Sequence, residues 1–172
     1  MSNLKILSIR VFVEATMIVA LSTVLSLIKI YELPQGGSVT AGSMVPLLWF
    51  SLRRGFRAGL FACTIYGLVQ FATGAYIVHP LQFLLDYPLA FGSLGLAGLF
   101  RKHPQIGVAV GMIGRFSSHF IAGFVFWSEY AGDMNPILYS ALYNGGYMVI
   151  EFIVSSVLIF AILKRKLLDI YI

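Results

Sequence analysis

Charged side chains are scarce in this sequence. Asp, Glu, Lys and Arg make up 11% of its 172 residues, whereas 59% of the residues are hydrophobic. Soluble domains carry about 25% charged residues, so this chain has too few to cover the surface of a soluble globule. The composition predicts an integral membrane protein that forms a single domain over residues 1–172.

Other absences exclude several kinds of chemistry. The single cysteine, Cys63, excludes a disulfide within the chain, and its apolar neighbours predict a small buried side chain. The sequence lacks the phosphate-binding pattern G-x-x-x-x-G-K-[ST] and the zinc-binding pattern H-E-x-x-H. ATP hydrolysis would therefore have to come from another subunit, and we expect no metal site, cofactor or catalytic residue.

Long apolar runs separated by Gly, Pro and charged residues predict an all-α protein with six transmembrane helices. The first run is longer than the apolar part of a typical signal peptide and is expected to remain as the first helix. The second spans about 13 residues, against the ~20 that cross a bilayer, so it either borrows length from the preceding Gly-Ser-Thr stretch or forms a shorter helix shielded by protein. The six segments are residues 6–28, 40–52, 56–74, 80–100, 106–128 and 136–163.

The positions of the charged residues predict the orientation. With six crossings, most basic residues fall on one side, which the positive-inside rule makes cytoplasmic together with both termini. The opposite side holds Lys29, Glu32, Glu129 and Asp133. The basic residues on the predicted cytoplasmic side are Lys5, Arg10, Arg53, Arg54, Arg57, Arg101, Lys102, Lys164, Arg165 and Lys166.

Ionisable groups inside the apolar segments cost roughly 2.5–3.5 kcal/mol or more each and need an explanation. Glu14 lies one helical turn after Arg10, so we expect a structural ion pair there. Glu151 either makes an internal polar contact or faces a partner subunit. Asp86 has Gln82 one turn before it, and it is either half of a buried salt bridge with Arg115 or His119, or an anion that awaits a cationic ligand.

Polar and aromatic residues recur at helical spacing on the last two segments. Arg115, His119, Gly123 and Trp127 form one row, while Tyr139, Tyr143 and Tyr147 form another beside Asn144. One carboxylate, ring faces and directional hydrogen-bonding groups at one depth suit a small, flat, cationic, nitrogen-rich ligand. Alternatively, these groups hold the helices to one another. The residues placed in the outer half of the bilayer are Asp86, His119, Gly123, Trp127, Tyr139 and Asn144.

Five stretches spread along the chain resemble a known family: PQGGSVT, SLRRGFRAGL, HPLQFLLDY, SHFIAGFVFW and YSALYNGGYM. They are similar to the ThiT family, the thiamin-specific substrate-binding (S) components of energy-coupling-factor (ECF) transporters. The resemblance implies six helices in a bacterial plasma membrane, no enzymatic activity, and a thiamin pocket that opens outward beneath the loop between the first two helices.

By position, the resemblance implies thiamin contacts at Asp86, Tyr87, Arg115, His119, Gly123, Trp127, Tyr139 and Asn144. Some members have glutamate and lysine where this chain has Asp86 and Arg115. Some also carry a tryptophan in the first loop, which this chain lacks. Here the loop would close through Tyr31 and the following Pro-Gln-Gly-Gly.

The resemblance also implies partners, namely a transmembrane coupling subunit and two cytoplasmic ATPase subunits, and no nucleic acid. The family docks its coupling subunit through small residues on the first helix, where Thr16 and Ala20 keep that spacing and Val24 interrupts it. Two alternatives stay open: an S component for another vitamin or a thiamin precursor, and an intramembrane enzyme using Asp86, His119 and Arg115. A third, a proton-coupled exporter of cations using Glu14, is disfavoured by the nearby Arg10.

Overall fold

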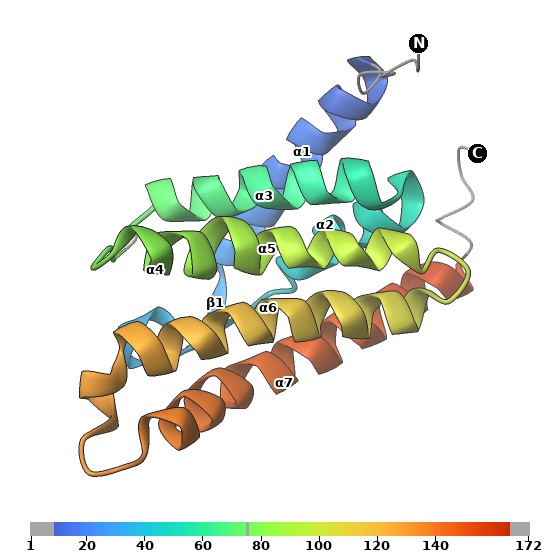
Figure 1. The fold of residues 1–172 in the computed structure, drawn as a ribbon. Coiled ribbons are helices and arrows are strands. Elements are labelled where there is room, and N and C mark those ends of the chain that lie inside the picture. Colours follow the sequence, from blue (N-terminus) through green and yellow to red (C-terminus); the bar gives the residue numbers. More distant parts are fainter. Residues whose placement is uncertain (1–8, 75, 166–172) are drawn as a thin grey trace.

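The structure is a computed structural model that describes residues 9–74 and 76–165. Helix α3, the stretch from α4 to η3, α6 and α7 run side by side, with α1 and α2 behind them in the view of Figure 1. The longer helices are α1 (Ile9–Leu27), α2 (Met44–Arg54), α3 (Phe56–Ala72), α6 (Pro104–Phe126) and α7 (Pro136–Lys164).

Helices are present in each of the six predicted apolar segments, within the described residues. Three of them, α1, α6 and α7, are long and apolar enough to cross a membrane by length and composition, and α3 is a shorter apolar helix. A helical membrane protein is therefore supported, whereas the count of six crossings stays a prediction.

Proline marks the starts of the last two helices. Pro104 and Pro136 occupy first-turn positions, where the missing N–H costs no hydrogen bond. Asn135 caps α7, since its side-chain oxygen accepts hydrogen bonds from the N–H groups of Ile137 at 2.9 Å and Leu138 at 3.3 Å.

The fourth predicted segment is not one regular helix. It divides into α4 (Pro80–Leu84), the π-helical turn η2 (Leu85–Leu89), α5 (Ala90–Gly92) and the 3₁₀ helix η3 (Ser93–Leu99). Pro88 lies inside the π turn and has no N–H to donate, which accounts for the departure from α-helical bonding. Asp86 lies in this turn, so the irregular backbone sets where its carboxylate points.

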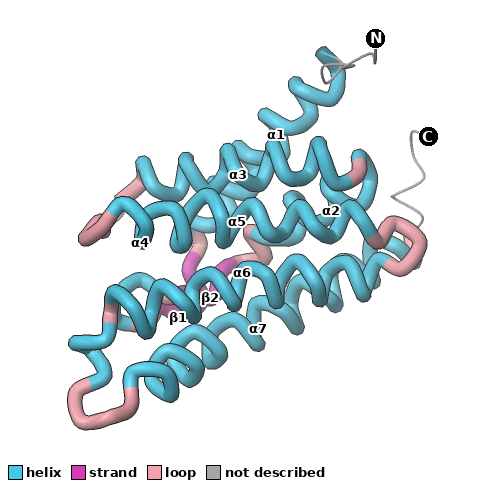
Figure 2. The backbone as a smooth tube through the Cα atoms, viewed as in Figure 1, coloured by secondary structure: helices cyan, strands magenta, loops and turns pink. Residues whose placement is uncertain are grey.

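A short hairpin precedes α2, and the expectation of helix from residue 40 is wrong for residues 40–43. Strand β1 (Lys29–Glu32) pairs antiparallel with β2 (Ser38–Thr40), and the 3₁₀ turn η1 (Pro34–Gly36) joins them. Figure 2 shows the hairpin behind α6, and β2 contacts both α1 and α7. Helix α2 is 11 residues long and mostly buried, which is the shorter, protein-shielded form that we considered.

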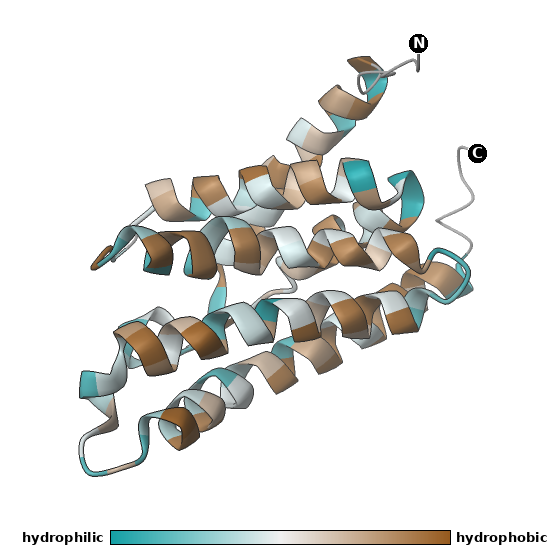
Figure 3. Ribbon diagram, viewed as in Figure 1, coloured by the Kyte–Doolittle hydropathy of each residue, from teal (hydrophilic) through white to brown (hydrophobic). Residues whose placement is uncertain are grey.

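Apolar side chains cover much of the outside of the bundle. Met17, Ile113 and Val157 are about three-fifths or more exposed, although they sit in the middle of long helices. In Figure 3 much of the helical ribbon has the colour of hydrophobic residues, and several of the turns have the colour of hydrophilic ones. Such a surface suits contact with lipid.

The turns after α2 and η3 lie at the same end of the bundle as the start of α1 and the end of α7 (Figure 1). This end carries the described residues of the basic set, while Lys5 and Lys166 lie outside the described residues. Glu14 of α1 contacts two residues of α2. It accepts a hydrogen bond from Nε of Arg54 at 2.8 Å and forms an ion pair with Nη1 of Arg53 at 3.2 Å. Glu14 therefore belongs to a structural cluster that joins two helices.

Candidate functional site

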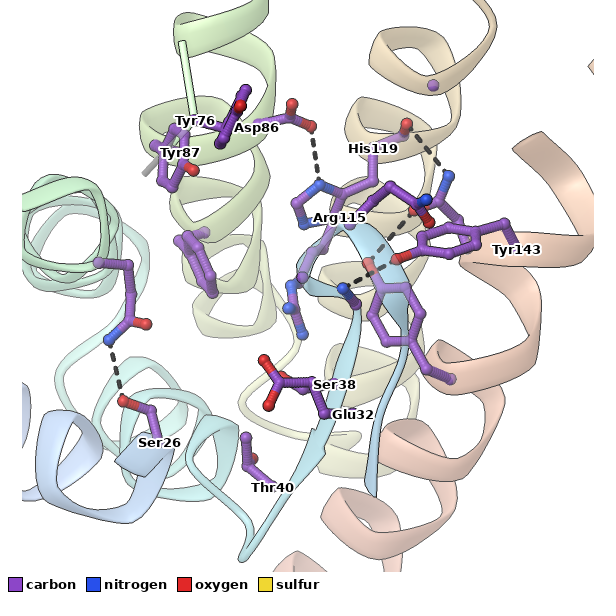
Figure 4. A pocket seen from close by; sticks show the side chains of 18 of the residues that line it. Ser26, Glu32, Ser38, Thr40, Tyr76, Asp86, Tyr87, Arg115, His119 and Tyr143 are labelled. Atoms are coloured by element: carbon purple, nitrogen blue, oxygen red, sulfur yellow. Dashed lines mark hydrogen bonds and ion pairs between the residues drawn. The ribbon is translucent and has the colours of Figure 1, made fainter. Parts of the chain in front are cut away.

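A cavity of about 690 Å³ opens between the hairpin and the helices. Its walls come from α1, β2, α2, α3, η2, α6 and α7 (Figure 4). All eight residues that the resemblance placed at the ligand line this one cavity: Asp86, Tyr87, Arg115, His119, Gly123, Trp127, Tyr139 and Asn144. The structure thus brings the predicted set together, and their contact with a ligand stays a prediction.

Asp86 accepts hydrogen bonds from three side chains. Its Oδ1 lies 3.0 Å from Nδ1 of His119, and its Oδ2 lies 2.7 Å from Nε2 of Gln82 and 3.3 Å from Nε1 of Trp127. The pair with His119 is one of the two salt bridges considered from the sequence; no ion pair joins Asp86 to Arg115 within the described residues. The Asp86 side chain keeps 15% of its surface exposed, so the carboxylate is oriented by protein and still reachable.

Arg115 has buried polar atoms that no described residue hydrogen-bonds. Its guanidinium carbon lies 4.7 Å from the centre of the Phe91 ring, and the residue is 6% exposed. Its Nε and Nη1, like Nε2 of His119, are buried and have no hydrogen-bond partner among the residues described. Unpaired buried donors cost free energy, so an acceptor in the cavity would stabilise them.

Gly123 and Asn144 hold α6 against α7. A Cβ at Gly123 would lie 2.1 Å from Oγ of Ser140, so glycine is needed for this close approach. Asn144 of α7 donates to the backbone oxygen of His119 in α6 at 3.4 Å, while within its own helix it donates to the backbone oxygen of Ser140 at 3.0 Å and accepts from the Tyr147 hydroxyl at 3.3 Å. Both residues line the cavity, but these contacts support the packing role that we weighed against ligand binding.

Aromatic rings form much of the remaining wall. Trp127 lies 6.2 Å from Tyr76 and 6.0 Å from Tyr130 between ring centres. Tyr139 stacks on Tyr143 at 5.8 Å. A flat cationic ring would find aromatic faces on two sides of such a cavity.

The hairpin loop is fastened to α7 by Tyr143. The Tyr143 hydroxyl donates to the backbone oxygen of Pro34 and accepts from the N–H of Gly37 at 3.0 Å. A Cβ at Gly37 would lie 2.8 Å from that hydroxyl oxygen, so the loop packs tightly here. The loop therefore lies over the cavity without a tryptophan, and it is held to α7 through Pro34 and Gly37 of the expected Pro-Gln-Gly-Gly segment, whereas Tyr31 does not line this cavity.

Sequence reasoning missed the wall formed by α1 and α3. Gln70 donates to Oγ of Ser26 at 3.0 Å, and both residues line the cavity together with Tyr66. The argument applied to Asp86, that a polar residue within an apolar segment needs a partner, would have singled out Gln70 as well.

The open question about Glu151 is answered by an internal contact. Its side chain is fully buried, and Oε1 accepts hydrogen bonds from the backbone N–H of Thr40 at 2.6 Å and from its hydroxyl at 2.8 Å. Thr40 lines the cavity, so Glu151 contacts the lining without being part of it.

Two further expectations concern other parts of the chain. Thr16 and Ala20 are exposed on the outer side of α1, as a docking face requires. Cys63 is fully buried, as its apolar neighbours predicted.

No group of three or more His, Cys, Asp or Glu residues that could hold a metal ion occurs among residues 9–74 and 76–165.

Comparison with known proteins gives a consistent result. Residues 12–171 match the family model described as Thiamine transporter protein (Thia_YuaJ). The chain is 32% identical over 167 residues to Thiamine transporter ThiT of Bacillus subtilis (strain 168), covering 86% of each chain. It is 29% identical over 137 residues to the protein of the same name from Lacticaseibacillus paracasei (strain ATCC 334), covering 67% of this chain and 68% of that one.

A solved structure is similar over nearly the whole fold. It is the structure titled "Native-SAD phasing for ThiT from Listeria monocytogenes serovar", with a TM-score of 0.84 and 30% sequence identity. The match covers 92% of this chain and 97% of that chain.

Proposed function

The chain belongs to the Thiamine transporter protein (Thia_YuaJ) family, and from this premise we propose that it is the thiamin-binding S component of an ECF transporter. Relatives named as thiamine transporters and a similar ThiT structure support the assignment to thiamin transport. The cavity supports the choice of ligand, since its residues match the chemistry of a flat, nitrogen-rich cation.

The observation that carries the ligand assignment is the arrangement around Asp86. Its carboxylate is fixed by His119 and Trp127 at the edge of a cavity with aromatic walls. A thiazolium ring beside this carboxylate gains electrostatic attraction, while the aromatic faces cover its apolar surface. Nε2 of His119 and the Nε and Nη1 of the Arg115 guanidinium are then available to the polar edges of the ligand.

The proposal extends to orientation and partners. The cavity and the hairpin face the outer side of the membrane, and the basic end of the bundle faces the cytoplasm. A coupling subunit docks on the face of α1 that carries Thr16 and Ala20, and two ATPase subunits supply the hydrolysis for which this sequence has no phosphate-binding pattern.

Equilibrium binding of thiamin to the detergent-solubilised protein tests the function. We expect tight binding of one thiamin per chain without partner subunits, and no chemical change of the ligand. Competition with riboflavin, biotin and the separate pyrimidine and thiazole halves of thiamin tests the alternative of another vitamin or a precursor. Weaker binding of thiamin than of one of these competitors would contradict the proposal.

An intramembrane enzyme is the candidate from another class. Asp86 and His119 are paired closely enough for proton transfer, yet neither side chain is hydrogen-bonded to a serine, cysteine or lysine side chain among the described residues. Recovery of unaltered thiamin after prolonged incubation favours binding over catalysis.

A further inference from the structure

Glu151 is a carboxylate with no exposed surface in the middle of α7. Its Oε1 accepts both hydrogen bonds of Thr40, a residue 111 positions earlier in the chain, whereas its Oε2 has no partner among the residues described. A charged group is expensive to bury unless it is hydrogen-bonded, so this contact is more than incidental packing.

Thr40 is in turn hydrogen-bonded to Ser43, directly before the start of α2. Its Oγ1 lies 2.8 Å from Oγ of Ser43 and accepts a hydrogen bond from the N–H of Ser43 at 3.2 Å. Helix α2 begins at the next residue, Met44. The Glu151 carboxylate therefore lies close to a helix N-terminus, where the helix dipole favours negative charge.

Among the described residues, hydrogen bonds join α7 to the hairpin at two places. Tyr143 binds Gly37 and Glu151 binds Thr40. Eight residues of helix rise about 12 Å, and three residues of strand span about 10 Å, so β2 and α7 run alongside each other between the two contacts. Tyr143 is half-buried, whereas Glu151 is fully buried.

We propose that Glu151 is a positioning residue of the binding cavity. It fixes Thr40, and through Thr40 it holds β2 and the first residues of α2 in place as a wall before any ligand arrives. Ser38, Thr40, Ser43 and Met44 of this wall line the cavity. The effect on ligand affinity rests on the proposed function, whereas the effect on the wall does not.

The test uses a reporter that needs no ligand. Ser38 of β2 is replaced by cysteine in a Cys63→Ala background, and its rate of labelling by a maleimide is measured in the full-length protein without thiamin. Glu151→Leu removes the oxygen that accepts both hydrogen bonds of Thr40 and should raise this rate about tenfold, the consequence of losing a charge-assisted hydrogen bond. Glu151→Gln retains an acceptor oxygen and should raise the rate less.

Ser155→Ala is the matched control. Ser155 is buried one turn further along the same face of α7, and its hydroxyl has no partner among the described side chains. We expect no change in the labelling rate for this variant. Equal rates for Glu151→Leu and the parent protein, or an equal increase for Ser155→Ala, would overturn the proposal.

A second pair of variants decides the matter if Glu151→Leu does not fold. Glu151→Gln and Thr40→Val are combined, because both keep the size of the side chain. Labelling rates that change less in the double variant than the product of the single changes support a direct coupling between the two residues. If the two substitutions change the labelling rate independently of each other, the proposal is overturned.

The rate of thiamin association and the melting temperature are measured on the same proteins. If Glu151 positions the wall, the association rate falls in Glu151→Gln and the melting temperature stays within a few degrees of the parent, which a general loss of stability would not produce. If the parent protein does not bind thiamin, the proposed function fails, and the labelling rates still decide the role of Glu151.

Discussion

Asp86 receives hydrogen bonds from Gln82, His119 and Trp127, and each donor comes from a different position around the carboxylate. The contact with His119 crosses from η2 to α6, so it also ties two segments together. Asp86 thus has a structural contact and also a surface that is exposed in the cavity. The effects of a substitution on ligand binding and on stability can be told apart only when both are measured.

Asp86→Asn keeps the shape of the side chain and removes its charge. We expect thiamin affinity to fall by one to two decades, because a charge-assisted contact contributes about 1.5–3 kcal/mol. The melting temperature without ligand should change little. Isothermal titration and thermal unfolding of the same sample measure the two quantities.

Asp133→Asn serves as the control for that change, since Asp133 is exposed in a turn and does not line the cavity. The structural alternative predicts that Asp86→Asn melts several degrees lower and binds thiamin as tightly as the parent. That result would refute the proposed contact.

Trp127 should report ligand binding by fluorescence. Its indole lines the cavity, whereas the other tryptophan, Trp49, lies under the Arg53 guanidinium at 4.8 Å and away from the cavity. A heteroaromatic ring against Trp127 should quench its emission. Trp127→Phe should lose most of the thiamin-dependent change and Trp49→Phe should keep it; the reverse pattern would place the ligand elsewhere.

At the scale of elements, α1 is the least buried of the three long apolar helices α1, α6 and α7. Of its 19 residues, Ala15, Ile18, Val19 and Ser22 are buried, and the opposite face is exposed. Thr16 and Ala20 lie on that exposed face, where small side chains allow another helix to approach closely.

Ala20→Trp should leave thiamin binding intact and abolish transport in cells, because the indole would hold the coupling subunit away from α1. Uptake of labelled thiamin and binding by purified protein are measured in parallel. Ile113→Trp is the control, since Ile113 is 63% exposed on α6. Normal uptake by Ala20→Trp would show that the docking face lies elsewhere.

At the scale of the whole molecule, the two ends of the bundle differ in charge. Arg53, Arg54, Arg101 and Lys102 gather at one end, where Arg101 also donates to the backbone oxygen of Leu52 at 3.0 Å. The turn that contains Asp133 lies at the opposite end (Figure 1). This asymmetry is the physical basis for the orientation proposed above.

Cysteine labelling in intact cells tests the orientation. In a Cys63→Ala background, Asp133→Cys should react with a membrane-impermeant maleimide added outside. Lys102→Cys should react only after the cells are permeabilised. Labelling of Lys102→Cys but not of Asp133→Cys in intact cells would indicate the opposite orientation.

Periodicity and composition were enough to predict part of the fold and of the candidate site. Apolar runs located the helices because a bilayer demands long hydrophobic segments. Helical spacing placed Arg115, His119, Gly123 and Trp127 in one row, and all four line the cavity, although α6 ends at Phe126 and Trp127 directly follows it. The π turn at Pro88 and the hairpin escaped prediction, since both depend on how the backbone is satisfied by neighbouring segments.

The sequence by itself determined that the protein is a helical membrane protein, where its helical segments lie and which polar residues interrupt them, because these follow from local hydrophobic patterns. Only the tertiary structure decided which polar groups meet. Asp86 bonds to His119, whereas Nε and Nη1 of Arg115 have no hydrogen-bond partner among the described residues, and Glu151 binds Thr40 across 111 positions. Such pairings depend on the distances between packed helices, which spacing within one helix does not specify.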